Sequence, residues 1–560
     1  MKLIVVGGVA GGASAAARAR RLDEAAQIIL FERGEYVSFA NCGLPYHIGN
    51  VIVDKDDLFI LTPDTFNKRT NIDVRICHEV VSVDADRKSV KVFDLRKKRY
   101  FEEKYDKLIL STGSSPFRPN LPGLDDPLVM VLWTINDMDR IIARINKGIK
   151  SAVVMGGGFI GLEVAENLQK RDVETTVVEM LPQVMPNFDF EMAESISGCL
   201  KKNNIRLVLN NAVTKLERKD NKNGQIVLTL QDNTELSADL VIMSVGVRPN
   251  SKLAEHAGMK IGNRGGIVVD KRLETSNPDI YAVGDVIETY SPVLNTPVQI
   301  PLAGPANKQG RIAAENALGG SIEYGGAIGT SICKVFDLSV ATAGANEKTL
   351  KEANIDYCKI YCHPFSHASY YPGAKPLSIK LLFNTAGMIL GCQITGEDGV
   401  DKRIDVIATA IRSKLSVYDL EELELAYAPP YGSAKDPVNF AGFIAANVLK
   451  QDSQIVHADK IPEDAFLLDI RDDDEVEIGV IPGSCHIPLG KLRSCIETLP
   501  KDKMIVTFCK IGLRGYLAER ILRQKGFSVK NLSGGIITWN AFHPKKQVPL
   551  DSCIPCNDKR

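Results

Sequence analysis

The sequence has no excess of charge of either sign and no long apolar run. It has 68 lysines and arginines against 69 aspartates and glutamates, a formal net charge of −1. Such a balance predicts no strong attraction to nucleic acid or to a membrane surface. The chain opens on a short apolar stretch, residues 1–6, without the basic and long apolar regions of a secretion signal or a membrane span. We therefore expect a cytoplasmic protein.

The sequence also lacks the regular cysteine spacing of a disulfide-rich protein. Its 12 cysteines are irregularly spaced, so reduced thiols are expected rather than a disulfide framework. Near the C-terminus, Cys553 and Cys556 form one Cys-x2-Cys pair with no second pair nearby. An inert tail is therefore favoured there over half a zinc site or a redox pair.

The sequence does contain a glycine-rich turn after its first apolar stretch. Residues 7–12, Gly-Gly-Val-Ala-Gly-Gly, follow a predicted strand and precede a predicted helix over 13–22. Glycine lets the backbone approach a pyrophosphate at a helix N-terminus, where free N–H groups and the helix dipole favour anions. Glu32 ends the next predicted strand, 28–31, and suits a pair of ribose hydroxyls. Because Val9 replaces the middle glycine of the G-x-G-x-x-G pattern, an ordinary glycine turn is the alternative.

A second copy of this pattern makes a dinucleotide site the better interpretation. Gly156, Gly158 and Gly161 occupy all three glycine positions between a predicted strand and a predicted helix. Glu179 closes the next predicted strand, 175–178, and no arginine is among the three residues that follow it. An acid at this position favours the free 2′-hydroxyl of NADH, with NADPH as the alternative. Two dinucleotides are therefore implied.

Two further segments complete a family resemblance. Residues 110–113, Leu-Ser-Thr-Gly, and 275–285, which end in Gly-Asp, are similar to signatures of the FAD-dependent pyridine nucleotide-disulfide oxidoreductases. The resemblance extends over about residues 1–445 and implies FAD, with Asp285 at its ribityl chain. The implied cofactor-binding residues are Gly7, Gly8, Ala10, Gly11, Glu32, Arg33, Thr112, Gly113, Asp285, Pro301, Ala303, Gly156, Gly158, Ile160, Gly161, Glu179 and Gly246.

Against that family, the sequence lacks a partner for Cys42. Where a two-cysteine enzyme has Cys-x4-Cys, the fifth residue after Cys42 is His47. Cys42 must then pair with sulfur on a small molecule or cycle between a thiolate and an oxidised form. Residues 38–46 resemble coenzyme A-disulfide reductases nearly residue for residue. The related oxidases and peroxidases carry a histidine in the first glycine turn, where this chain has Val9 and Ala10.

The resemblance to coenzyme A-disulfide reductases implies further site residues. Tyr370 and Tyr427 match two tyrosines that the partner subunit supplies, and such a hydroxyl can stabilise a thiolate or protonate a leaving thiol. The implied substrate-binding residues are Arg18, Arg21, Ser38, Asn41, Arg69 and Lys435. Two positions depart from the family: Thr70 stands where a lysine is expected, with Arg69 or Lys68 as a substitute, and Asn307 stands where a histidine is common. The alternatives are a solvated basic face for the arginines and interface packing for the tyrosines.

A cluster of possible metal ligands precedes Tyr370. We expect it to belong to the same interface segment and to hold no metal. Its members are Cys358, Cys362, His363 and His367.

The C-terminal part contains a second cysteine site. A predicted strand leads into Cys509, and a predicted helix, 515–522, follows. Backbone N–H groups, with Lys510 and Arg514, would surround the sulfur and stabilise a thiolate and then a persulfide. The Cys-x4-Arg loop is one residue shorter than the Cys-x5-Arg loop of phosphatases, which favours sulfur chemistry, with Arg514 as a substrate-binding residue. Together with Asp469 and Arg471 as structural supports, residues 453–548 resemble a rhodanese domain.

The predicted fold is α/β, with two Rossmann-like FAD and NAD domains, an α+β dimerisation domain and a C-terminal α/β rhodanese domain. The predicted domains are FAD binding at 1–112 and 246–322, NAD binding at 113–245, dimerisation at 323–447 and rhodanese at 453–548.

The predicted protein is a homodimeric flavoenzyme that uses NADH to reduce coenzyme A persulfide, polysulfide or coenzyme A disulfide. Cys42 is its redox residue, and Cys509 is a coupled sulfurtransferase site. The alternatives are an NADH oxidase or peroxidase with an accessory rhodanese, and a sulfur carrier or redox sensor without enzymatic activity.

Overall fold

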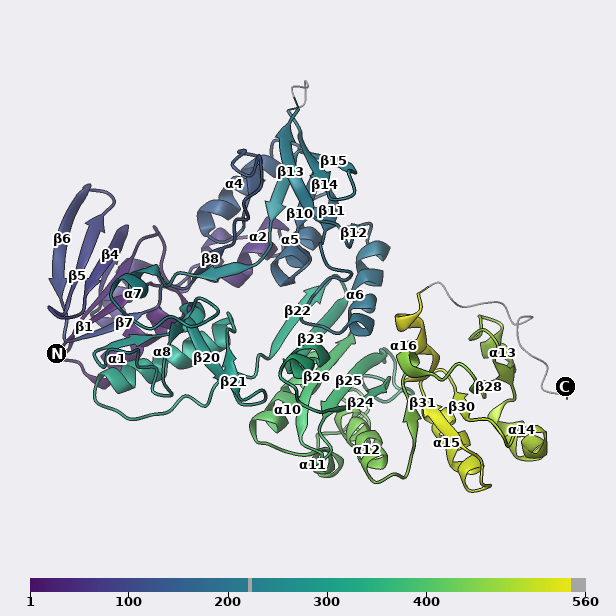
Figure 1. Cartoon of the computed structure of the whole chain (residues 1–560). Coiled ribbons are helices and arrows are strands. Elements are labelled where there is room, and N and C mark those ends of the chain that lie inside the picture. Colours follow the sequence, from purple (N-terminus) through teal and green to yellow (C-terminus); the bar gives the residue numbers. More distant parts are fainter. Residues whose placement is uncertain (220–223, 545–560) are drawn as a thin grey trace. The chain divides into compact units, whose positions relative to one another are not determined.

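The computed structural model describes residues 1–219 and 224–544. The chain divides into two compact units (Figure 1): unit 1 comprises Met1–Val184 and Lys201–Gly329, and unit 2 comprises Met185–Leu200 and the chain from Thr330 onward. The Cys553 and Cys556 pair and the last residues of the predicted 453–548 segment lie outside the described residues. No helix in the described part of the chain is both long and apolar enough to cross a bilayer.

The first large sheet of unit 1 is parallel and has the strand order β19-β7-β1-β2-β3. Its strands are β1 (Lys2–Val6), β2 (Gln27–Glu32), β3 (Asp73–Ile76), β7 (Lys107–Leu110) and β19 (Ile280–Ala282). They are almost continuously apolar, as expected of a parallel sheet covered on both faces. Helix α1 (Ala10–Leu22) packs against α8 (Ala303–Ala317). Helix α1 begins three residues before its predicted start, because the end of the glycine turn already forms its first turn.

The second large sheet of unit 1 repeats this arrangement, with the order β12-β11-β10-β16-β9. Its elements are β9 (Val129–Met130), α4 (Ile135–Ile145), β10 (Ser151–Met155), α5 (Phe159–Gln169), β11 (Glu174–Val178), β12 (Arg206–Val208) and β16 (Leu240–Met243). The antiparallel pair β8 (Ser114–Pro116) and β17 (Val247–Pro249) joins the two halves of unit 1. Two Rossmann-like halves are therefore present, as predicted.

Smaller elements complete unit 1. Two antiparallel sheets are formed by β4 (His78–Asp84), β5 (Ser89–Asp94) and β6 (Arg99–Lys104), and by β13 (Val213–Arg218), β14 (Ile226–Leu230) and β15 (Glu235–Ala238). The rest are α2 (Leu44–Ile48), α3 (Pro63–Thr70), α7 (Lys252–His256), β18 (Ile267–Val268), β20 (Ile287–Ser291) and β21 (Thr296–Val298).

Unit 2 begins with an antiparallel sheet in the order β22-β23-β26-β25-β24. Its strands are β22 (Ser331–Val335), β23 (Leu338–Gly344), β24 (Cys358–Cys362), β25 (Leu377–Phe383) and β26 (Ile389–Gly396). Its helices are α9 (Glu347–Glu352), α10 (Val400–Arg412), α11 (Val417–Glu422) and α12 (Pro437–Leu449), and α6 (Phe190–Lys202) begins in this unit. Helix α10 packs on β23 and β26, and α12 packs on β24. This is the predicted α+β region.

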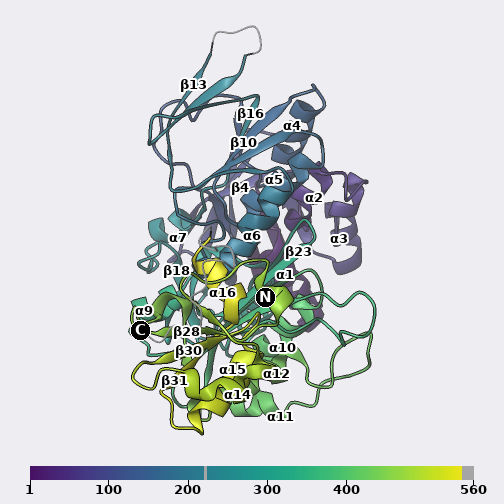
Figure 2. The same ribbon diagram turned by 90° about the vertical axis from the view of Figure 1, so that its right-hand side faces the viewer.

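The second sheet of unit 2 is parallel, in the order β27-β31-β30-β28-β29. Its strands are β27 (Ile455–Val456), β28 (Phe466–Asp469), β29 (Cys485–His486), β30 (Ile505–Phe508) and β31 (Val529–Leu532), and its helices are α13 (Asp473–Val476), α14 (Leu489–Cys495), α15 (Leu513–Arg523) and α16 (Gly535–Phe542). Helices α15 and α16 pack beside β31 (Figure 2). The predicted fold class is confirmed.

Candidate functional site

The first glycine-rich turn joins β1 to α1 and leaves the start of the helix open. Gly7 has a φ of +100°, and a Cβ there would lie 2.1 Å from the carbonyl oxygen of Ser111. Among the described residues, no side chain caps α1 at Val9, so its first N–H groups can receive a phosphate. Glu32 accepts a hydrogen bond from the Gly8 N–H at 2.8 Å, which places its carboxylate beside the turn. This cradle fits the pyrophosphate and ribose of FAD.

Further predicted FAD residues lie where β7 and β19 end, and ligands of α/β folds bind at this edge of a parallel sheet. Asp285 follows β19 and accepts a hydrogen bond from Ser114 Oγ at 2.8 Å, while burial raises the pKa of its carboxyl. Thr112 Oγ1 donates to the Asn250 carbonyl at 2.9 Å, and Asn250 donates back to the Thr112 carbonyl at 2.8 Å. The other predicted residues here are Gly113, beside Thr112, and Pro301 and Ala303, at the start of α8.

The second glycine-rich turn has the same construction. Gly156 has a φ of +101°, and no side chain of the described residues caps α5 at Gly158. Glu179, which follows β11 and is nearly buried, accepts hydrogen bonds from the N–H groups of Gly157 at 2.7 Å and Leu181 at 2.9 Å. Its remaining lone pairs suit the ribose hydroxyls of NADH. The other predicted residues are Ile160 and Gly161, in the first turn of α5, and Gly246, before β17.

Cys42 lies in a short turn, Asn41–Gly43, that leads into α2, and its side chain is exposed. Its Sγ lies 3.8 Å from Asn41 Oδ1. The surrounding protein removes part of the water around the thiol, and this desolvation raises the pKa of Cys42. The negative charges of Glu163 and Asp285 raise this pKa further. This interaction with Asp285 supports a thiol beside the FAD site. Unit 1 itself favours the protonated thiol, so thiolate formation needs a donor or a positive charge from another source.

The two predicted tyrosines come together in unit 2. Tyr370 follows β24 and Tyr427 follows α11, and their hydroxyl oxygens are 2.9 Å apart. Tyr370 is 73 % exposed and Tyr427 is 49 % exposed. The hydrogen bond with Tyr427 raises the pKa of Tyr370. The two phenols are therefore exposed to solvent and joined by one hydrogen bond.

The predicted substrate-binding residues of α1 and α3 differ in their surroundings. Arg18 forms an ion pair with Glu315 on α8, at 2.6 Å. Its neighbour Arg20 is buried and donates to the carbonyls of Thr70 and Asn71, each at 2.9 Å, so it fastens α3 to α1. Of the other predicted substrate-binding residues, Ser38 is half-buried, and Arg21, Asn41, Arg69 and Lys435 are exposed. Arg33, predicted to bind FAD, is also exposed.

The Cys509 loop follows β30 and holds the sulfur inside unit 2. Cys509 is 1 % exposed, and the Gly512 N–H donates to its Sγ at 3.2 Å. Arg514, predicted to bind substrate, contacts Asp472 and Glu475, each at 2.7 Å. The hydrogen bond to Glu475 raises the pKa of Arg514. The arginine charge is therefore largely compensated by these two carboxylates.

Asp469 and Arg471 support this loop from β28. Arg471 Nη2 contacts Asp469 Oδ2 at 2.6 Å, and both side chains are buried. Arg471 also donates to the carbonyls of Glu475 and Gly479, at 3.0 and 2.9 Å. Arg471 therefore fixes the segment that carries the carboxylate partners of Arg514.

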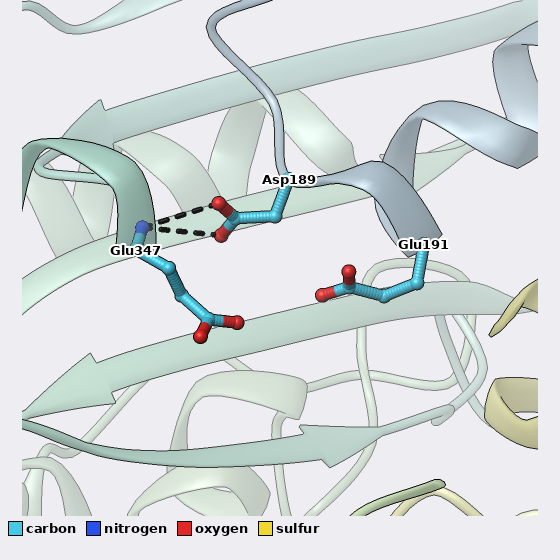
Figure 3. A group of neighbouring side chains, drawn as sticks. All are labelled: Asp189, Glu191 and Glu347. Carbon is cyan, nitrogen blue, oxygen red and sulfur yellow. Dashed lines mark hydrogen bonds between the residues drawn. The ribbon is translucent and has the colours of Figure 1, made fainter. Parts of the chain in front are cut away.

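One group of three carboxylates among the described residues is close enough to hold a metal ion. Figure 3 shows Asp189, Glu191 and Glu347 pointing toward one another. Lys380, which is fully buried, contacts all three, at 2.7 Å from Asp189 Oδ2. Burial alone would lower the pKa of Lys380, but the three carboxylates outweigh this effect and raise it. The Lys380 ammonium is thus the cation that all three carboxylates share, and Lys359 also contacts Glu347, at 2.9 Å.

Three segments of the chain match known protein families. Residues 1–310 match the pyridine nucleotide-disulphide oxidoreductases, residues 330–436 match the dimerisation domain of that family, and residues 453–542 match the rhodanese-like domain. The chain belongs to the pyridine nucleotide-disulphide oxidoreductase family. The predicted family is confirmed, and its members use FAD and NAD(P)H.

Some relatives of this oxidoreductase match only its oxidoreductase part, and others match nearly the whole chain, including the rhodanese part. A coenzyme A disulfide reductase of Staphylococcus aureus (strain bovine RF122 / ET3-1) is 37 % identical over 447 residues, which are 79 % of this chain and 99 % of the relative. The structure of reduced Bacillus anthracis CoADR-RHD matches with a TM-score of 0.95 and 46 % identity, over 98 % of this chain and 99 % of its own. The structure of an NAD-dependent persulfide reductase from A. fulgidus matches with a TM-score of 0.91 and 38 % identity, over 96 % and 100 %.

The oxidoreductase has a pair beside Cys42 that the sequence did not reveal. Tyr46, one turn after Cys42, donates a hydrogen bond to Glu163 Oε1 at 2.9 Å. Burial raises the pKa of Glu163, although the Tyr46 hydrogen bond opposes this shift. Tyr46 lies in the run 38–46, but Glu163 is 117 positions away. The only sequence signal was that Glu163 follows the second glycine-rich turn.

Glu179 gives the oxidoreductase a testable cofactor preference. We expect Glu179→Gln to raise the KM for NADH about tenfold and to reduce the preference over NADPH, because a neutral amide loses charge-assisted hydrogen bonds to the ribose. Steady-state kinetics with both cofactors measures this change. The control is Glu174→Gln, since Glu174 is an exposed residue of the same strand. An unchanged KM ratio in Glu179→Gln would contradict the assignment.

Proposed function

We propose that this oxidoreductase is an FAD enzyme that uses NADH to reduce coenzyme A disulfide and coenzyme A persulfide through Cys42. Its rhodanese part carries sulfane sulfur on Cys509. The observation that carries the proposal is the presence of two differently built cysteine sites on one chain. Cys42 is exposed and interacts with Asp285 of the FAD site, whereas Cys509 is buried under a backbone N–H group. The two structures that match nearly the whole chain support this pairing.

In the proposed reduction, the Cys42 thiolate attacks the sulfur that is bonded to the carbon of coenzyme A persulfide. A Cys42–coenzyme A disulfide forms, the persulfide S–S bond breaks and HS⁻ leaves. Bound FAD supplies a path for two electrons from NADH to this disulfide. The disulfide takes up these electrons and one proton, which gives the Cys42 thiolate and coenzyme A thiol. The net products of NADH and the persulfide are NAD⁺, coenzyme A and HS⁻.

The chain's own residues have two tasks in this scheme. The Tyr370–Tyr427 pair donates a proton to the leaving thiolate, and in the proposed homodimer the second copy supplies this pair. The exposed cations Arg21 and Arg69 bind the phosphates of coenzyme A. Arg18 contributes less, because Glu315 already neutralises it.

In the proposed sulfur transfer, the Cys509 thiolate attacks the outer sulfur of a donor persulfide. A Cys509 persulfide forms, and the donor leaves as a thiolate. Coenzyme A thiolate then takes the same outer sulfur, which restores the Cys509 thiolate and gives coenzyme A persulfide. The product of one site is the substrate of the other, so their fusion raises its local concentration.

Anaerobic stopped-flow measurement of NADH oxidation tests this function. We expect coenzyme A persulfide and coenzyme A disulfide to be reduced at least about tenfold faster than peroxide, because the first glycine turn has no histidine. The fastest turnover with peroxide or, in aerated buffer, with oxygen would instead establish an oxidase or peroxidase. Slow turnover with every acceptor, together with a stable complex with another protein, would establish a sensor or carrier.

A further inference from the structure

The loop that carries Cys509 is held from behind by the start of α16. The N–H of Ile536 donates to the Cys509 carbonyl at 2.9 Å, and the N–H of Ile537 donates to the Lys510 carbonyl at 3.2 Å. Gly535 has a φ of +61°, and a Cβ there would lie 2.3 Å from the Cys509 carbonyl oxygen. These contacts fix two carbonyls of the loop on α16, while the Gly512 N–H points to the sulfur. The placement of α16 therefore sets the geometry around the nucleophile.

The other side of the same turn contacts β24 of the antiparallel sheet. The Tyr361 N–H donates to Ser533 Oγ at 3.2 Å, and His363 Nε2 lies 2.9 Å from Thr538 Oγ1. A Cβ at Gly534 would lie 2.8 Å from Tyr361 Cβ and 2.0 Å from Thr538 Oγ1, so the backbones meet without space for a side chain. All four hydrogen-bonding residues are less than 9 % exposed. Two hydrogen bonds, from Tyr361 of β24 and from His363 directly after it, therefore join this strand end to the segment that holds the Cys509 loop.

On the β24 side, both residues are fixed in place. His363 Nδ1 lies 3.0 Å from Ser378 Oγ on the neighbouring strand β25, so both ring nitrogens have partners. Burial lowers the pKa of His363 to about 4, which keeps the ring neutral. The Tyr361 hydroxyl donates to Glu191 at 2.7 Å, and the Lys380 ammonium lies 5.4 Å from the centre of its ring. Neither side chain can turn without losing a buried hydrogen bond.

We propose that His363 and Tyr361 of the dimerisation region are positioning residues for Cys509. They hold Thr538 and Ser533, which fix the start of α16, and α16 holds the two carbonyls of the nucleophile loop. The proposal rests on the proposed role of Cys509 as a sulfur carrier. It makes the sulfurtransferase site dependent on the neighbouring sheet of the oxidoreductase, and it gives the cluster around His363 a role other than metal binding.

The experiment uses Thr538→Val and Thr538→Ser in the full-length, FAD-loaded chain. Valine keeps the shape of threonine but leaves His363 Nε2 without its partner, whereas serine restores the hydroxyl. We expect Thr538→Val to slow single-turnover sulfur transfer from Cys509 to coenzyme A about tenfold and to move the pH midpoint of Cys509 alkylation upward, since a displaced N–H stabilises the thiolate less. Thr538→Ser should return both values to within about twofold of wild type.

Two further variants keep the outcome decisive. Ser533→Ala removes the other hydrogen bond, and it should move both readouts in the same direction, which tests the proposal even where Thr538→Val does not fold. Thr395→Val is the matched control, because Thr395 is a buried hydroxyl of the same sheet, 3.3 Å from Ser195 Oγ. Its strand, β26, is separated from β24 by β25. Coenzyme A disulfide reduction should be unchanged in all variants.

The alkylation profile separates this proposal from the proposed function. Folded Thr538→Val and Ser533→Ala with a wild-type alkylation midpoint would overturn the positioning role. The positioning role would also be overturned if Thr538→Ser failed to restore the alkylation midpoint. A wild-type protein that accepts sulfur from no donor would overturn the sulfur-carrier function, while the midpoints would still report on the positioning of Cys509.

Discussion

Replacement of Cys42 by serine is expected to lower NADH-driven reduction of coenzyme A disulfide and coenzyme A persulfide at least about 10³-fold. A serine hydroxyl cannot form the disulfide to coenzyme A through which the electrons pass. The exposed turn around Cys42 contains no second cysteine: His47 occupies the position at which a two-cysteine enzyme has the second cysteine of its disulfide. The rate of NADH loss under anaerobic conditions, with each sulfur substrate in turn, measures this effect.

The electron path before Cys42 provides the internal control. Reduction of FAD by NADH in Cys42→Ser should stay within about twofold of wild type, because the glycine-rich turns and Glu179 are unchanged. Cys495→Ser is the matched substitution, since Cys495 is a half-buried cysteine on α14. It should leave turnover unchanged. Full persulfide reduction by Cys42→Ser would show that sulfur is reduced elsewhere and would remove the basis of the proposed function.

The features that the sequence predicted well are those whose physical cause is local. A glycine turn between a strand and a helix is visible over a dozen residues, because backbone approach to a phosphate demands glycine there. The same holds for the Cys509 loop between β30 and α15. Glu32 and Glu179 lie beside these turns because a carboxylate at the end of the second strand has a fixed place relative to the turn, while their role in cofactor binding stays a prediction. Their hydrogen bonds to Gly8 and Gly157 show that closeness.

The features that the sequence could not supply depend on partners far along the chain. Arg18 was predicted to bind coenzyme A, but its partner Glu315 is 297 positions away on α8. Arg514 was predicted to bind substrate, and its carboxylate partners precede it by 42 and 39 positions. No spacing rule relates such residues, because only the packing of whole elements brings them together. Their roles in binding stay predictions.

Long-range packing also explains why His363 and Lys380 were not recognised. His363 stood in a cluster of cysteines and histidines, and a residue of that kind alone does not indicate a hydroxyl partner 175 positions away. Lys380 lies in an apolar strand, and three acidic residues from α9 and the start of α6 surround it. A buried lysine requires such compensation, because an isolated charge in the protein interior is strongly unfavourable. The same group holds Tyr361, so stability and the proposed positioning of Cys509 share one anchor.

Lys380→Met is expected to lower the free energy of unfolding by about 3–5 kcal/mol. Methionine has a similar volume, but Asp189 and Glu191 would lose the cation that they contact. Glu347 would lose it too but would keep its ion pair with Lys359, at 2.9 Å. Urea titration of the holoenzyme, followed by a probe in unit 2, measures the loss. The matched control is Lys375→Met, whose ion pair with Glu397 is 2.7 Å long but 47 % exposed on both sides. It should leave the free energy of unfolding nearly unchanged, because an exposed ion pair contributes little to stability.

The pH dependence of the Lys380→Met deficit identifies its cause. The pKa of Lys380 is raised, so its contribution in the wild type is complete below the ordinary lysine pKa and is lost only as the pH rises through its higher value in the fold. In Lys380→Met, Asp189 and Glu347 lose the Lys380 charge, which lowers the pKa of both carboxyls in the wild type, so they take up protons as the pH falls. The deficit should therefore shrink between about pH 8 and pH 5. A deficit that is equal at both pH values, or no larger than that of Lys375→Met, would show that the ammonium is not what stabilises this group.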